Sequence, residues 1–190
     1  MSMRAGLVPL TIFFMILVFS PFGLAAEAVK VIFDTDLSTD VDDVGAVAVL
    51  HRLADLGETH IVAMGVSSNE PHSAACLDAL NTYFGRPNVP IGAPKGRALD
   101  EKSKHTEAIA KEFSHDLIST ADAPDVVDVY RETLAAQPDG SVVLITVGFL
   151  TNVKSLLESK PDRHSPLDGP ELVRRKVKHW VCMGGRFPSG

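Results

Sequence analysis

The stretch Val31-Ile-Phe-Asp34-Thr-Asp36-Leu-Ser-Thr-Asp40-Val-Asp42-Asp43 decides the fold of this 190-residue chain. The apolar run from Val29 to Phe33 predicts a buried β-strand, and the apolar run from Val44 to Leu50 predicts a helix. Five aspartates therefore lie in one strand-to-helix turn, which we call the acid turn (residues 34–43). In open α/β sheets, ligands bind at this end of the strands.

The density of negative charge in the acid turn predicts a bound cation, because neighbouring carboxylates raise one another's pKa. Hard oxygen ligands without nearby Cys or His suit Ca²⁺ or Mg²⁺ rather than zinc. The structural alternative is helix capping, since carboxylates are favoured at a helix N-terminus. Capping accounts for two or three of the acids but poorly for all five.

The composition is that of an ordinary globular protein, with 45% hydrophobic and 22% charged residues. The length suits one α/β domain with a sizeable core. A net charge of −6 argues against a nucleic-acid partner, whose binding surface would usually be basic. The two cysteines, Cys76 and Cys182, show no framework pattern, so we expect two buried thiols.

Residues 1–28 have the pattern of a secretory signal peptide. Arg4 precedes a long apolar run, and small residues at positions 25, 26 and 28 offer cleavage sites. The apolar run approaches membrane-spanning length, but the small-residue end favours cleavage, which would leave no stable membrane anchor. We therefore expect a secreted or periplasmic protein with one folded domain, residues 29–190.

After the signal, strand and helix patterns alternate. Strands are predicted at 29–33, 60–66, 88–92, 141–147 and 177–183, and helices at 44–56, 73–84, 125–137 and 152–159. One or two short helices are expected within 97–124, and a loop at 160–170. This order predicts an α/β fold, an open and mostly parallel sheet with helices on both faces. The polar triplet Ser67-Ser68-Asn69 ends the second strand, as a candidate substrate contact or a plain turn.

Three known motifs can be compared with the acid turn. An EF-hand loop needs Gly at its sixth position and Glu at its twelfth; this chain has Thr39 and Gly45 there, which excludes that motif. The run Asp34-Thr-Asp36 resembles the Asp-x-Asp motif of haloacid dehalogenase-type phosphatases. The whole turn also resembles the Asp-x-Asp-Pro-Gly-x-Asp-Asp motif of nucleoside hydrolases, with two more residues in its middle.

Four motifs in order make the chain resemble the calcium-dependent, inosine-uridine-preferring nucleoside hydrolases. They are the acid turn, Ser67-Ser68-Asn69, Gly148-Phe-Leu-Thr-Asn152 and Met183-Gly184-Gly185. The resemblance implies a Rossmann-like core, Ca²⁺ as the cofactor and a nucleoside as the small-molecule partner. The resemblance is also compatible with a homo-oligomer. The phosphatase alternative lacks its later acidic pair and gives Asp42-Asp43 no role.

The resemblance also assigns roles by position. It implies that Asp36 and Asp43 are calcium ligands, that Asp36 is the general base, and that the carbonyl of Val147 is a further ligand. Asp42 and Asn69 would contact the ribose. The implied reaction is hydrolysis of the N-glycosidic bond of a ribonucleoside by a calcium-activated water, giving ribose and free base.

Members of that family extend well beyond the Met-Gly-Gly motif, so the resemblance implies that this chain is the N-terminal part of the family domain. The last calcium ligand and the leaving-group acid would then lie outside it. Two alternatives to the hydrolase remain open: a phosphatase using Asp34 and Asp36, and a catalytically incomplete domain that binds metal or nucleoside. In the hydrolase, Asp34 would orient the turn.

Overall fold

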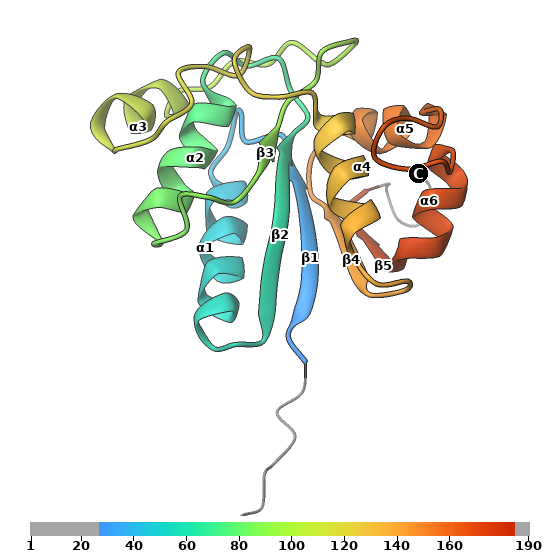
Figure 1. The fold of residues 1–190 in the computed structure, drawn as a ribbon. Helices are drawn as coiled ribbons and strands as arrows, with labels where there is room; N and C mark the ends of the chain where they lie inside the picture. The colour runs from blue at the N-terminus through green and yellow to red at the C-terminus, as the bar shows by residue number, and fades with distance from the viewer. Residues whose placement is uncertain (1–26, 185–190) are drawn as a thin grey trace, which may run out of the picture.

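The computed structural model describes residues 27–184 as a five-stranded parallel sheet (Figure 1). Its strands, in the spatial order β3-β2-β1-β4-β5, are β1 (Val29–Thr35), β2 (Thr59–Val66), β3 (Ile91–Gly92), β4 (Val142–Thr146) and β5 (Val177–Cys182). Every pairing between these strands is parallel, which confirms the predicted open sheet. The chain adds β2 and β3 on one side of β1 and then β4 and β5 on the other.

Helices cover both faces of the sheet, as the alternating pattern predicted (Figure 1). One face carries α1 (Asp42–Asp55), α2 (Ser73–Tyr83) and α3 (Thr106–Glu112), and the other carries α4 (Val126–Ala136), α5 (Thr151–Glu158) and α6 (Gly169–Lys176). Helix α6 was not predicted from the sequence. Its start is marked by Asp168, whose side chain accepts a hydrogen bond from Glu171 N, and by Pro170 in the first turn.

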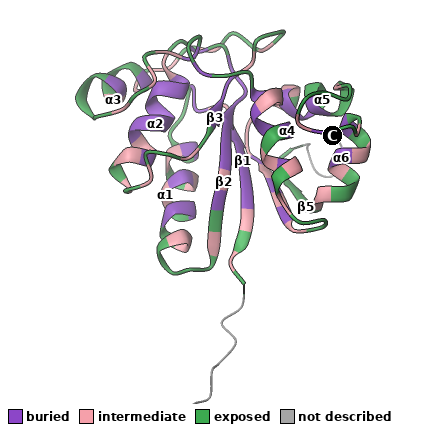
Figure 2. Cartoon of the chain, in the orientation of Figure 1, coloured by how far each residue is buried: buried purple, intermediate pink, exposed green. Residues whose placement is uncertain are grey.

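The core is divided between the two faces of the sheet because neighbouring side chains of a strand point to opposite sides. Val31 and Phe33 pack toward α1 and α2, whereas Ile32 packs with Tyr130 and Leu144 beneath α4. Figure 2 shows this burial along β1, β2 and the inner faces of the helices. A strand buried on both faces suits a central parallel position, which is where β1 lies.

The edge strand β5 is largely exposed, and this corrects one prediction. Cys76 is a buried free thiol as expected, but Cys182, on β5, is an exposed one. Within residues 27–184, no helix is long and apolar enough to cross a membrane. The predicted signal peptide lies outside the described residues, apart from its last two positions.

Gly65, on β2, leaves room for the side chain of Tyr130, on α4, to reach the end of β1. A Cβ atom at Gly65 would lie 2.1 Å from Tyr130 Oη. Since Gly65 has no side chain, Tyr130 extends past β2 and its hydroxyl meets Asp34 at the end of β1. This contact ties one helix layer to the acid turn.

Candidate functional site

The acid turn lies where the strand order reverses, between the carboxyl ends of β1 and β4 (Figure 1). Val147 N, just after β4, donates to Asp34 O at 2.8 Å. A Cβ atom at Gly148 would lie 2.3 Å from Asp36 N, so only glycine allows the two loops to approach this closely. Such a reversal point is the usual ligand site of an open α/β sheet.

Asp34 is completely buried beneath the acid turn. Its Oδ2 accepts hydrogen bonds from Tyr130 Oη at 2.6 Å and from Asn152 Nδ2 at 2.8 Å. Burial raises the pKa of Asp34 from 3.8 to about 7, and the two hydrogen bonds partly oppose that rise. Its Oδ1 is buried without a partner in the described part of the chain. A phosphatase would need this carboxylate as an accessible nucleophile, so its burial weighs against that alternative.

Asp36 and Asp43 form a carboxyl pair above the end of β1. Asp36 is half-buried, and its pKa is raised to about 7, first by burial and then by its hydrogen bond to Asp43. The charges of Asp43, Asp40 and Glu101 add to the rise. Asp43 is buried, and its Oδ2 accepts a hydrogen bond from Leu37 N at 2.9 Å. Two carboxyl groups this close favour either a shared proton or a cation between them.

The other predicted site residues lie around this pair. Asp42 is exposed in the first turn of α1, and its Oδ1 accepts from the main-chain nitrogen of Asp43, but no side chain of the described residues caps this helix end. Val147 is half-buried after β4. Asn69 is exposed and donates to Asp100 Oδ1 at 3.3 Å, and none of its described hydrogen bonds is to the acid turn.

Several contacts at the site could not be predicted from the sequence. Ser67 and Ser68 were candidate substrate contacts, but both are buried and their hydroxyls bind main-chain atoms of the acid turn. Asn152 belongs to a recognised motif, yet its partner could not be read from that motif. Tyr130 was only one member of an apolar helix stripe, and Glu101 gave no signal at all.

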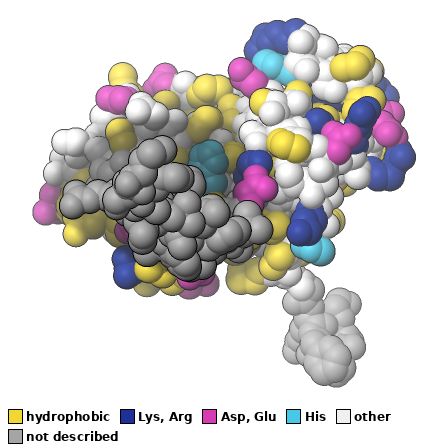
Figure 3. All heavy atoms as spheres, turned by 60° about the horizontal axis from the view of Figure 1, so that its bottom comes forward, with side chains coloured by type: hydrophobic (Ala, Val, Ile, Leu, Met, Phe, Trp, Pro, Cys, Tyr) yellow, Lys and Arg dark blue, Asp and Glu magenta, His cyan; other side chains and the backbone are white. Residues whose placement is uncertain are grey.

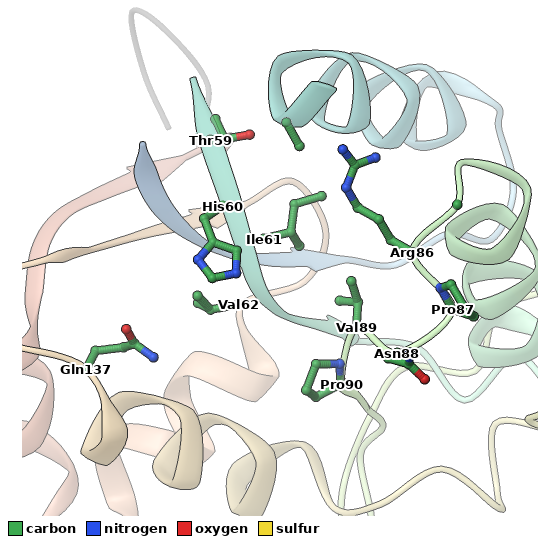
Figure 4. Close-up of a pocket in the computed structure, with 12 residues that line it drawn as sticks. Thr59, His60, Ile61, Val62, Arg86, Pro87, Asn88, Val89, Pro90 and Gln137 are labelled. Carbon is green, nitrogen blue, oxygen red and sulfur yellow. The ribbon is translucent and has the colours of Figure 1, made fainter. Parts of the chain in front are cut away.

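A cavity of about 610 Å³ lies away from the acid turn. Figure 4 shows it between the start of β2, with His60 and Val62, and the loop from Arg86 to Pro90. Its lining contains no carboxylate, and Arg86 donates to Asp55 at 2.6 Å just outside it. Around this end of the molecule, acidic and basic side chains are interspersed on the described surface (Figure 3). His60 is the one side chain of its described lining that could act as a base, and no residue of the acid turn lines it.

A second group of potential metal ligands is an ion-pair network. Oxygen and nitrogen atoms of Asp128, Asp162 and His164 lie within 4.8 Å of one another. However, Arg131 binds Asp162 at 2.6 Å and Arg163 binds Asp128 at 2.5 Å. Because each carboxylate already has a guanidinium partner, these residues form an ion-pair network rather than an open set of metal ligands.

Comparison with known proteins supports the fold. No protein-family model and no curated protein sequence matches the chain. Among solved structures, the effector protein XOO4466 matches with a TM-score of 0.64 and 19% identity. The type III effector XopQ, solved in complex with adenosine diphosphate ribose, matches at 0.65 and 20%. The plant nucleoside hydrolase PpNRh1 matches at 0.56 and 21%.

These matches cover 87%, 87% and 83% of this chain but 46%, 45% and 48% of the other proteins, so the chain spans about half their length. At this level of identity the likeness shows the fold alone. The chain has an α/β fold that a plant nucleoside hydrolase shares. None of the matches identifies the narrower inosine-uridine-preferring family.

Proposed function

We propose that this protein is an N-ribohydrolase that cleaves a ribosyl bond at the acid turn. The observation that carries the proposal is the Asp36–Asp43 carboxyl pair at the reversal point of a fold shared with a plant nucleoside hydrolase. The proposed substrate is a small ribonucleoside-like molecule. The complex of the similarly folded XopQ with adenosine diphosphate ribose supports this class of ligand.

Ca²⁺ is the proposed cofactor, and the donor set fits it. Asp36 and Asp43 offer hard carboxylate oxygens, and the carbonyl of Val147 is the proposed third protein ligand. The pKa of Asp36 is raised first by burial and then by the neighbouring carboxyl groups, and a cation would offset the second of these causes. Bound there, Ca²⁺ would polarise a water molecule toward attack on the anomeric carbon.

Three residues of the chain would then have separate roles in the reaction. Asp36, half-buried beside Asp43, would accept the proton of the attacking water, and a carboxylate can do so within hydrogen-bond reach. Asp42 and Asn69, both exposed near the turn, would bind the ribose hydroxyls. The negative charge of the acid turn would favour the positive, oxocarbenium-like sugar in the transition state. Export through the signal at residues 1–28 would place this activity outside the cytoplasm.

The test is ribose release from inosine, uridine and a nitrophenyl riboside with added Ca²⁺, beside calorimetric Ca²⁺ titration. Asp36→Asn and Asp43→Asn should both weaken Ca²⁺ binding and lower ribose release by about 10²-fold or more. Asp116→Asn, a matched change at an exposed aspartate on the loop after α3, should alter neither.

Three outcomes would contradict the proposal in different ways. Undiminished ribose release by Asp36→Asn would show that Asp36 is not the general base. Binding of Ca²⁺ and nucleoside without ribose release from any of the three substrates would favour a binding domain. Phosphate release from a phosphomonoester, lost in Asp34→Asn, would instead favour the phosphatase.

A further inference from the structure

We infer that Ser67 and Ser68 are positioning residues that fix the carboxyl pair of the acid turn through its main chain; this rests on the proposed function in taking that pair as the site. Consecutive main-chain carbonyls of the turn each lie within hydrogen-bond distance of a different serine hydroxyl. The contacts are Ser67 Oγ to Thr35 O at 3.2 Å, Ser68 Oγ to Asp36 O at 2.8 Å and Ser73 Oγ to Leu37 O at 2.9 Å.

All three serines are completely buried, so their hydroxyls depend on protein groups for hydrogen bonds. Ser67 also accepts a hydrogen bond from Phe149 N at 3.1 Å, so it links the turn after β1 to the loop after β4. Ser68 has the shortest of the three contacts. The single proton of Ser73 is shared between Leu37 O and Glu70 Oε2, at 3.0 Å, which makes Ser73 the weaker contact.

The turn needs such support because its centre is strained. Leu37 has a φ of +40°, in the left-handed region that costs a non-glycine residue about 1–2 kcal/mol. In this conformation Leu37 N points at Asp43 Oδ2, 2.9 Å away. The main chain at Leu37 therefore sets where the Asp43 carboxylate lies relative to Asp36. Ser68 holds the carbonyl of this same peptide and Ser67 holds the carbonyl before it, so the serines hold the carboxyl pair.

Removing the Ser68 hydroxyl leaves the Asp36 carbonyl without its donor while changing little volume. Residues that orient metal ligands through hydrogen bonds, without binding the metal themselves, typically change metal affinity by about 10–100-fold when mutated. We therefore expect Ser68→Ala to weaken Ca²⁺ binding by about that factor. The Leu37 amide, freed to open locally, should exchange its hydrogen about 5–10-fold faster, the effect of losing one buried hydrogen bond.

The experiment compares Ser68→Ala with Ser141→Ala in the full chain. Ser141 is a matched control because its hydroxyl also donates to a carbonyl, Pro138 O at 2.7 Å, at the other end of β4. Ca²⁺ affinity is measured by calorimetry, and exchange of the Leu37 amide and of β4 amides by NMR. Faster exchange at Leu37 alone, with weaker Ca²⁺ binding, is the expected result, and Ser68→Thr should restore both.

Unchanged exchange at Leu37, or equal acceleration throughout β4, would overturn the inference, since the serine would then act on global stability alone. If the wild type binds no Ca²⁺, the proposed cofactor fails, while exchange at Leu37 still decides the positioning role. If Ser68→Ala does not fold, Ser67→Ala gives the same decision at the Leu37 amide, because the Ser67 hydroxyl donates to Thr35 O two residues before it.

Discussion

Replacing Asp34 with Asn should stabilise the protein above neutral pH. Asp34 is fully buried, and burial raises its pKa from 3.8 to about 7. A carboxyl group whose folded pKa lies above its unfolded value contributes its full stability below the unfolded pKa. That contribution is lost as the pH rises through the folded pKa. Asn carries no charge at any pH, so the variant should lack this loss.

The size of the effect follows from the pKa of Asp34. Each pKa unit is worth about 1.4 kcal/mol, so the wild type should lose about 4 kcal/mol between pH 4 and pH 8.5 through this group. The hydrogen bonds from Tyr130 and Asn152 are already included, since they lower that pKa. The amide oxygen of Asn can accept both donors as Oδ2 does, but its NH2 group then takes the place of the unpartnered Oδ1, which should cost about 1 kcal/mol at every pH. The variant should therefore be less stable than the wild type by about 1 kcal/mol at pH 3, slightly more stable at pH 5 and more stable by about 3 kcal/mol at pH 8.5.

The assay is urea unfolding of both proteins at a series of pH values. EDTA is included, because a cation at the neighbouring carboxyl pair would favour the charged form of Asp34. Asp116→Asn serves as the control, since its exposed side chain should give a difference from wild type that does not vary with pH. A difference between Asp34→Asn and wild type that is constant from pH 5 to 8.5 would refute the reasoning.

Three further changes test other parts of the structure by urea unfolding. Gly148→Ala should destabilise the folded protein by about 1–3 kcal/mol, because its Cβ would lie 2.3 Å from a main-chain nitrogen of the acid turn. As the control, Gly45→Ala, at a helical position with open space, should stabilise the folded protein slightly. Arg131→Met should cost about 1–3 kcal/mol, because the buried guanidinium also donates to the carbonyls of Ser165 and Leu167, which the variant leaves without that donor. A loss below about 1 kcal/mol would show these contacts to be dispensable. Burial lowers the pKa of His51 below 6.5, so wild-type stability should fall as the pH drops below 6.5, and His51→Gln should flatten that fall.

The sequence by itself determined the layered parallel sheet and the place of the acid turn in it. Both follow from patterns within a few residues of one another: apolar runs, turn residues and the spacing of the aspartates. A strand followed by a helix and a parallel strand leaves few arrangements. Helix α6 was not predicted because it is short and holds only two large apolar residues, Leu172 and Val173, among charged ones; its capping residues were the remaining signal.

The tertiary structure decided which groups surround the aspartates. Tyr130 and Asn152 reach Asp34 from 96 and 118 positions away in the chain. Ser67 and Ser68 turn inward to the main chain of the acid turn, although a polar triplet after a strand looks the same whether it faces solvent or the core. Local periodicity holds no information on such pairs. They depend on the reversal of strand order beside β1 and on the close approaches that Gly65 and Gly148 allow.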